Sequence, residues 1–109
     1  MELKINTTDK IQIVTIEGDI DSSVASVVTD KIVPLATAKA KIIIDMTEVA
    51  YMSSAGLRTL LSIHRQATNN EAQLILVGIS EDIKDTMSVT GFLNFFTISE
   101  SLESAKGII

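Results

Sequence analysis

The sequence contains no cysteine and no tryptophan, and it has only one proline, one histidine and few aromatic residues. Without cysteine the chain forms no disulfide and offers no thiolate to a metal, which agrees with a reducing compartment. No apolar run approaches the roughly 18 residues that a membrane-spanning helix needs. The opening residues, MELKINTTDK, alternate charged and apolar side chains and do not resemble a leader peptide. We therefore expect a cytoplasmic protein that does not enter a membrane.

Basic residues are also scarce, because 9 Lys and Arg stand against 14 Asp and Glu, for a formal net charge of −5. No local run of lysine or arginine compensates, so the electrostatic footprint of a nucleic-acid-binding protein is missing. The chain has 109 residues and is 46% hydrophobic, a size and composition that suit one hydrophobic core. We expect a single domain over residues 1–109.

The first third of the chain predicts a hairpin followed by a helix. Leu3 and Ile5 alternate with polar neighbours, and residues 11–18, IQIVTIEG, are rich in β-branched side chains. Two strands joined by a tight turn are therefore expected. Behind the polar stretch DIDSS, helical spacing predicts a helix from Ser22 to about Thr37. Pro34 lies inside this helix and should kink it or end it early. The apolar residues that set the spacing are Val24, Val27, Val28, Ile32 and Leu35.

Two short continuous apolar runs, KIIID at 41–45 and LILVG at 74–78, are typical of parallel strands covered by helices on both faces. The whole pattern predicts an α/β fold of order β-β-α-β-α-β-α-β-α, with a mixed and mostly parallel sheet covered by about four helices. The remaining expected elements are a helix from near Gly56 to the TNN at 68–70, a helix over 80–91, a strand over 95–99 and a short helix over 101–107.

The stretch SSAG, residues 53–56, lies in the predicted loop between strand 41–45 and the following helix. Such loops, at the carboxyl ends of strands, are where α/β sheets place their functional sites. One interpretation is that Ser53 or Ser54 caps the helix and that Gly56 permits close packing. The other is that one serine is a chemical target, exposed where free amides and the helix dipole tolerate a phosphate. The residue pattern alone leaves both open.

A serine hydrolase is excluded by the position of the single histidine. His64 follows Ser54 by ten residues, which is about 15 Å along a continuous helix, so no Ser–His hydrogen bond is available. The GxSxG nucleophile elbow is absent as well. We interpret His64 as a residue on the flank of its helix.

The acidic pair Asp19 and Asp21 precedes the first predicted helix. Asp21 or Ser22 is expected to cap that helix, with Asp19 a solvated turn residue. Asp21 also brings negative charge near the Ser54 loop if the second and third strands pair side by side. Two carboxylates without further clustered ligands do not make a dedicated metal site, so no metal is expected.

Asp45 raises a rival hypothesis, because an aspartate at the end of KIIID resembles the phospho-acceptor of response-regulator receiver domains. Receivers also carry paired acids directly after the first strand and a lysine after the fifth. Here the acids follow the second strand, and the last predicted strand is followed by Glu100. The receiver-like use of Asp45 is therefore the second choice.

Three stretches taken together, GDID at 18–21, KIIIDMTEVAYMSSAGL at 41–57, and LILVG at 74–78 with its following helix and FLNFFTIS, resemble an anti-sigma factor antagonist, a single STAS domain. The resemblance covers nearly the whole chain. It implies phosphorylation of the serine two residues before the glycine, which is Ser54. Ser53 stands where the family usually has aspartate and is the less favoured acceptor, and Asp21 matches the family's acidic residue near the modified serine.

The resemblance further implies a bacterial partner-switching regulator that is not an enzyme and needs no cofactor. Unphosphorylated, it would bind a serine kinase of the GHKL ATPase type that also acts as an anti-sigma factor, and phosphorylation would release it. A PP2C-type phosphatase would restore it. A STAS adaptor in a pathway without a sigma factor is the alternative, and a monomer is expected.

Residues around Ser54 are the expected partner surface. Leu57 has core packing as its alternative, and Arg58 a purely solvated position. The cluster GFLNFF at 91–96 is interpreted as core, with an exposed partner patch at Phe92 as the alternative. The full set of switch and partner-binding candidates is Asp21, Met52, Ser53, Gly56, Leu57 and Arg58.

Overall fold

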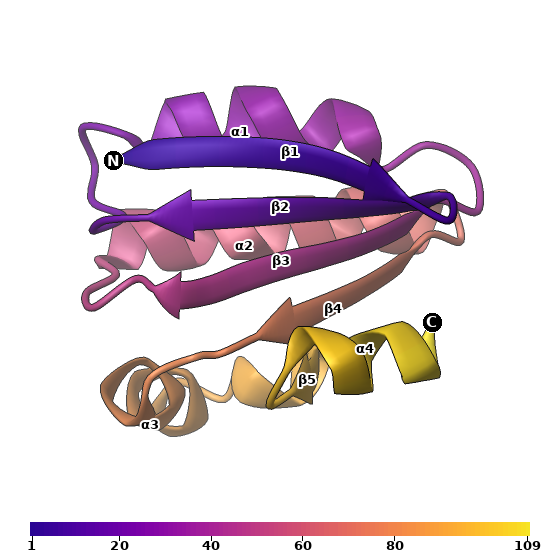
Figure 1. Cartoon of the computed structure of the whole chain (residues 1–109). Coiled ribbons are helices and arrows are strands. Elements are labelled where there is room, and N and C mark those ends of the chain that lie inside the picture. The colour runs from indigo at the N-terminus through magenta and orange to yellow at the C-terminus, as the bar shows by residue number, and fades with distance from the viewer.

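Five strands form one sheet in which spatial order follows chain order (Figure 1). The computed structural model describes all residues, 1–109. The first two strands pair antiparallel and the remaining neighbours pair parallel, so the predicted mixed sheet with an N-terminal hairpin is confirmed. The strands are β1 (Glu2–Thr8), β2 (Ile11–Glu17), β3 (Lys41–Glu48), β4 (Gln73–Val77) and β5 (Thr97–Ser99).

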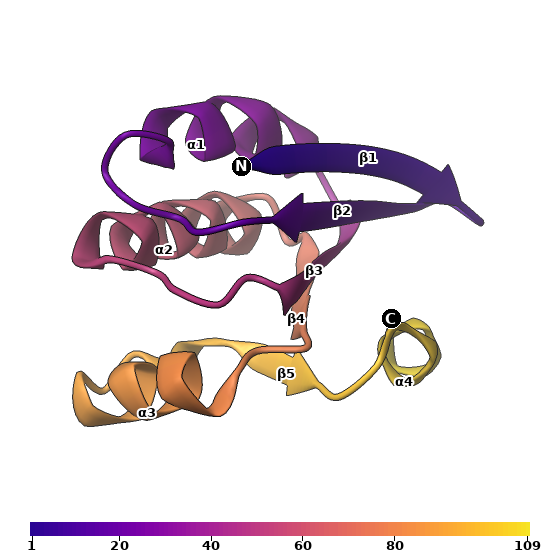
Figure 2. The same ribbon diagram turned by 60° about the vertical axis from the view of Figure 1, so that its left-hand side comes forward.

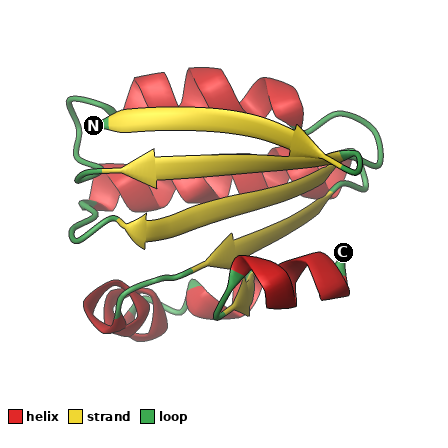
Figure 3. Cartoon of the chain, viewed as in Figure 1, coloured by secondary structure: helices red, strands yellow, loops and turns green.

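Four α-helices cover the sheet unequally. Helices α1, α2 and α3 lie on one face and α4 lies alone on the other, as Figure 2 shows. The alternation of strands and helices along the chain is visible in Figure 3 and agrees with the predicted element order. The helices are α1 (Ala25–Ile32), α2 (Ser54–Asn69), α3 (Glu81–Val89) and α4 (Leu102–Ile108), with short 3₁₀ turns η1 (Val33–Leu35) and η2 (Leu93–Phe95).

The continuous apolar run of β3 is explained by this double covering. Ile42 and Ile44 belong to the large core cluster shared with α1 and α2, whereas Ile43 belongs to a smaller cluster with Ala105 of α4. All three isoleucines are fully buried. Alternate side chains of a strand point to opposite faces, so a central strand with helices on both sides has no polar position over this stretch.

The hairpin between β1 and β2 turns through Asp9 and Lys10. Both residues have positive φ angles, 50° and 67°, which match the two-residue turn whose twist suits antiparallel strands. In the strand register Thr8 faces Ile11, which leaves Asp9 and Lys10 as the two residues of the turn. The predicted tight turn is confirmed.

The first helix is shorter than its sequence pattern predicted. Residues 22–24 form a turn, in which the carbonyl of Asp21 accepts hydrogen bonds from the amides of Val24 and Ala25, and α1 begins at Ala25. The helix ends at Ile32 and tightens into η1. Pro34 lies in η1 and lacks an amide for an α-helical bond, so the expected early end is confirmed.

The phenylalanine cluster departs from the prediction of a core strand. Residues 93–95 form a 3₁₀ turn and β5 starts only at Thr97. Phe95 is 53% exposed, and its ring stacks on His64 of α2 with centroids 6.0 Å apart. Phe92, Leu93 and Phe96 are partly buried and pack against the main core, so the core interpretation holds for them and is wrong for Phe95 alone.

Helices α1, α2 and α3 all begin near the same end of the sheet, where β2, β3 and β4 have their carboxyl ends (Figure 1). This end brings together the loops that contain Asp21 and the SSAG stretch. None of the helices combines the length and the apolar character that crossing a membrane requires.

Candidate functional site

The loop between β3 and α2 is tied to the segment that follows β2. Ile20 and Met52 form an isolated parallel bridge, in which the Ile20 amide donates to the Tyr51 carbonyl at 3.0 Å and the Ser53 amide donates to the Ile20 carbonyl at 2.8 Å. This bridge places Asp21 beside the start of α2. The predicted proximity of Asp21 to the serine loop therefore holds.

The two serines have different roles at the start of α2. Ser53 is the N-cap, with extended backbone, and its Oγ accepts a hydrogen bond from the Gly56 amide at 3.3 Å. Ser54 is the first helical residue and is exposed. The amides of Ser54 and Ala55 have no acceptor within the chain, as is usual for the first turn of a helix. The predicted serine cap is thus Ser53, and Ser54 remains free of that role.

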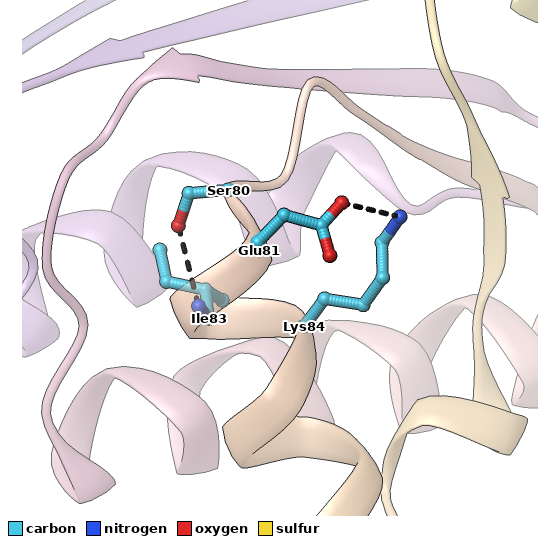
Figure 4. A network of polar contacts seen from close by, with 4 residues as sticks. All are labelled: Ser80, Glu81, Ile83 and Lys84. Carbon is cyan, nitrogen blue, oxygen red and sulfur yellow. Dashed lines mark hydrogen bonds and ion pairs between the residues drawn. The ribbon is translucent and has the colours of Figure 1, made fainter.

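A second helix at the same end of the sheet shows that one serine is enough to start it. Ser80 caps α3 by accepting from the Ile83 amide at 3.2 Å, and the next residue is Glu81, which pairs with Lys84 at 3.8 Å (Figure 4). Helix capping therefore accounts for the serine at position 53, whereas the hydroxyl of Ser54 is not needed to start α2.

Gly56 lies where α2 approaches the Ile20 bridge most closely. A Cβ atom on Gly56 would lie 2.6 Å from Met52 Cγ and 2.8 Å from the Ile20 carbonyl oxygen. Both distances are shorter than van der Waals contact, so a side chain at this position would push the helix off the bridge. Gly56 therefore sets the packing of the site and is buried, which gives it no surface to offer a partner.

Asp21 organises the turn before α1 and does not cap that helix, which corrects the expectation for Asp21 and Ser22. The N-cap of α1 is Val24 and receives no side-chain hydrogen bond. Instead, the Asp21 carboxylate accepts from the Ser23 hydroxyl at 2.5 Å and from the Ser23 amide at 2.9 Å. The hydrogen bond from the Ser23 hydroxyl, and next in size that from the Ser23 amide, hold the pKa of the Asp21 carboxyl below its ordinary value. The carboxylate therefore stays charged beside the serine loop.

The predicted contact residues divide between core and surface. Leu57 is only 6% exposed because it lies on the apolar side of α2, so its interpretation as a contact residue is wrong and the core alternative holds. Met52 is half-buried, whereas Arg58 is exposed. Tyr51, which the sequence analysis did not single out, is 55% exposed in the same loop. A large aromatic residue two positions before the serine stretch was the available signal.

Asp45 and His64 lie away from this loop. The Asp45 carboxylate accepts hydrogen bonds from the amide and hydroxyl of Thr47, at 3.0 and 2.6 Å. By strand alternation Asp45 points to the α4 face of the sheet, opposite to α2, and no group of three or more acids and histidines is placed to hold a metal ion. His64 packs against Phe96 with ring centroids 5.3 Å apart, consistent with a helix-flank residue.

The geometry is thus an exposed serine at a helix start, beside a charged aspartate and in a loop held by a backbone bridge. Comparison with protein families matches residues 2–105 to the STAS domain. The chain belongs to the STAS domain family. This confirms the family predicted from the sequence, and within it the relatives of this STAS domain include anti-sigma factor antagonists.

Among these relatives is the anti-sigma-B factor antagonist of Bacillus subtilis, which is 33% identical over 94% of this chain and 93% of its own length. The fold matches an anti-sigma factor antagonist from Mycobacterium paratuberculosis with a TM-score of 0.79, 16% identity, and coverage of 99% of this chain and 92% of the other. It also matches the anti-sigma factor antagonist SpoIIAA in its unphosphorylated form, with a TM-score of 0.73, 16% identity, and coverage of 98% and 94%. A Bacillus SpoIIAA structure in the phosphorylated form matches with a TM-score of 0.75, 16% identity, and coverage of 99% and 100%.

Proposed function

We propose that this STAS domain is an anti-sigma factor antagonist that acts by partner switching and is phosphorylated on Ser54. The observation that carries the proposal is that the two serines at the start of α2 differ. Ser53 caps the helix, whereas Ser54 is exposed and takes no part in the cap. In the reaction, Ser54 Oγ bonds to the γ-phosphorus of ATP, the bond from that phosphorus to the bridging oxygen breaks, ADP leaves, and the hydroxyl proton passes to a base of the kinase.

The unphosphorylated protein binds its kinase, which also serves as the anti-sigma factor, through the surface around Ser54. A phosphate adds a charge of about −1.5 to −2 and three acceptor oxygens. Burying such a group without partners costs several kcal/mol, which is enough to lower affinity by orders of magnitude. The Asp21 carboxylate is charged and lies beside the same loop, so its negative charge adds to that of the phosphate on the binding surface. A PP2C-type phosphatase reverses the switch, and the domain itself catalyses nothing.

The exposed part of this surface consists of Tyr51, Ser54 and Arg58, and Met52 of the same loop is half-buried. Exposed tyrosine and arginine are the side chains most enriched at protein interfaces. Gly56 and Leu57 support the surface from below without touching the partner.

The test is fragment mass spectrometry of the protein isolated from its own cells, followed by incubation with the serine kinase that co-purifies with it and ATP. We expect one phosphate on Ser54, abolished in Ser54→Ala and retained in Ser53→Ala. Ser62→Ala is the matched control, because Ser62 is exposed on the same helix. Phosphate on Ser53 would move the acceptor by one residue, and an acyl phosphate on Asp45 would replace the proposal by the receiver-like alternative.

A further inference from the structure

Arg58 is exposed on α2, four residues after Ser54, and forms no ion pair in the protein. The whole of α2, Ser54–Asn69, contains no aspartate or glutamate, although the chain as a whole carries a net charge of −5. Helix α3 differs, because its Lys84 is paired with Glu81 (Figure 4). The first cation of α2 is therefore left without an anion.

Residues four apart on a helix are neighbours, with Cβ atoms about 5–6 Å apart. Long side chains of a helix lean toward its N-terminus, which directs the Arg58 guanidinium to the turn that contains Ser54. An acid placed N-terminal to a base at this spacing is also the favoured order. The planar guanidinium matches phosphate oxygens with two parallel hydrogen bonds.

We propose that Arg58 binds the phosphate of phosphorylated Ser54 within the same molecule, an inference that rests on the proposed function. The pairing makes Arg58 part of the switch. In the unphosphorylated protein its guanidinium is free to contact the partner, and in the phosphorylated protein the same group is engaged by the phosphate. Modification of Ser54 then removes a cation from the docking surface at the same time as it adds an anion.

The test places phosphoserine at position 54 during synthesis by codon suppression, so that no kinase is needed, and follows the phosphate by phosphorus NMR across pH. The second ionisation of phosphoserine has an ordinary pKa of about 6. We expect it to be about 0.3 unit lower in the protein with Arg58 than in Arg58→Gln, as for an exposed helical ion pair. The difference should shrink as salt is added, and Arg58→Lys should keep part of it.

Arg65→Gln is the matched control, because Arg65 is exposed on the same helix but lies eleven residues, or about 16 Å, beyond Ser54. Equal phosphate pKa values with and without Arg58 would overturn the pairing, and so would an equal effect of Arg58→Gln and Arg65→Gln. Circular dichroism verifies that each variant is folded. The two proposals fail separately, since cells that never modify Ser54 contradict the proposed function, whereas the encoded phosphoserine measures the pairing in either case.

Discussion

Replacing Gly56 by alanine tests whether the closeness of α2 to the Ile20 bridge is essential to the site. The new Cβ would lie 2.6 Å from Met52 Cγ, 2.8 Å from the Ile20 carbonyl oxygen and 2.9 Å from Ile20 Cγ2. The methionine side chain is flexible and can move. The Ile20 carbonyl cannot move without weakening the hydrogen bond that it accepts from the Ser53 amide.

The expected change in the free energy of unfolding follows from one stabilising and two destabilising effects. Alanine is favoured over glycine inside a helix by about 1 kcal/mol, whereas overpacking a tight contact costs about 1–3 kcal/mol and a weakened hydrogen bond costs about 1 kcal/mol. We therefore expect Gly56→Ala to lower the free energy of unfolding by about 1–3 kcal/mol. For a domain of this size the melting temperature should fall by about 5 °C or more.

Urea denaturation followed by circular dichroism measures the effect, with Gly107→Ala as the control. Gly107 also lies in a helix, α4, but a Cβ atom there would have no neighbour within 4 Å. The Gly107→Ala variant should be as stable as the wild type or slightly more stable. If Gly56→Ala were also neutral or stabilising, the close approach of α2 to Ile20 would not constrain position 56, and our account of the loop would fail.

Two further substitutions test the cap and the charged turn. Ser53→Ala removes the acceptor of the Gly56 amide and should cost about 0.5–1 kcal/mol, at the lower end for a cap because that bond is long at 3.3 Å; Ser53→Asp should retain stability in the same urea titration, and equal stability of the alanine variant would contradict the cap. The pKa of Asp21 is below its ordinary value of 3.8 in the folded protein, so its stabilising charge is present above that pH and lost as pH falls through the folded pKa. Asp21→Asn keeps an acceptor oxygen without that titration, so its melting temperature should lie below that of the wild type at pH 6, and the gap should narrow as pH falls below 3.8. A gap independent of pH would count against the charge.

The sheet was predictable because its signals are strong and local. Residues 41–45 and 74–78 could be assigned as central strands, since only a strand covered on both faces tolerates an uninterrupted apolar run. The cap of α2 could likewise be narrowed to Ser53 or Ser54, and the early end of the first helix could be predicted from Pro34. Each of these features depends on the backbone chemistry of a few consecutive residues.

The errors arose where contacts distant in the sequence decide the outcome. The late start of α1 is a local exception, since residues 22–24 form a turn in which the Asp21 carbonyl accepts hydrogen bonds from the amides of Val24 and Ala25. Phe95 is apolar, but it lies in the 3₁₀ turn before the short β5, where it is exposed and its ring stacks on His64 of another element. The close packing expected of Gly56 is confirmed, but its partner Ile20 lies thirty-six residues earlier in the chain, so the sequence could locate the loop without showing which of its residues are exposed.

The arrangement at the start of α2 allows a charge to be added without changing the fold. The cap bond is made by Ser53 Oγ, the loop is held by backbone hydrogen bonds to Ile20, and the helix is seated by the bare backbone of Gly56. None of these contacts uses the hydroxyl of Ser54. A phosphate on that hydroxyl therefore breaks no native hydrogen bond, and the free amides of the first turn tolerate its charge. The switch that we propose consequently acts on the binding surface and leaves the stability of the domain almost unchanged.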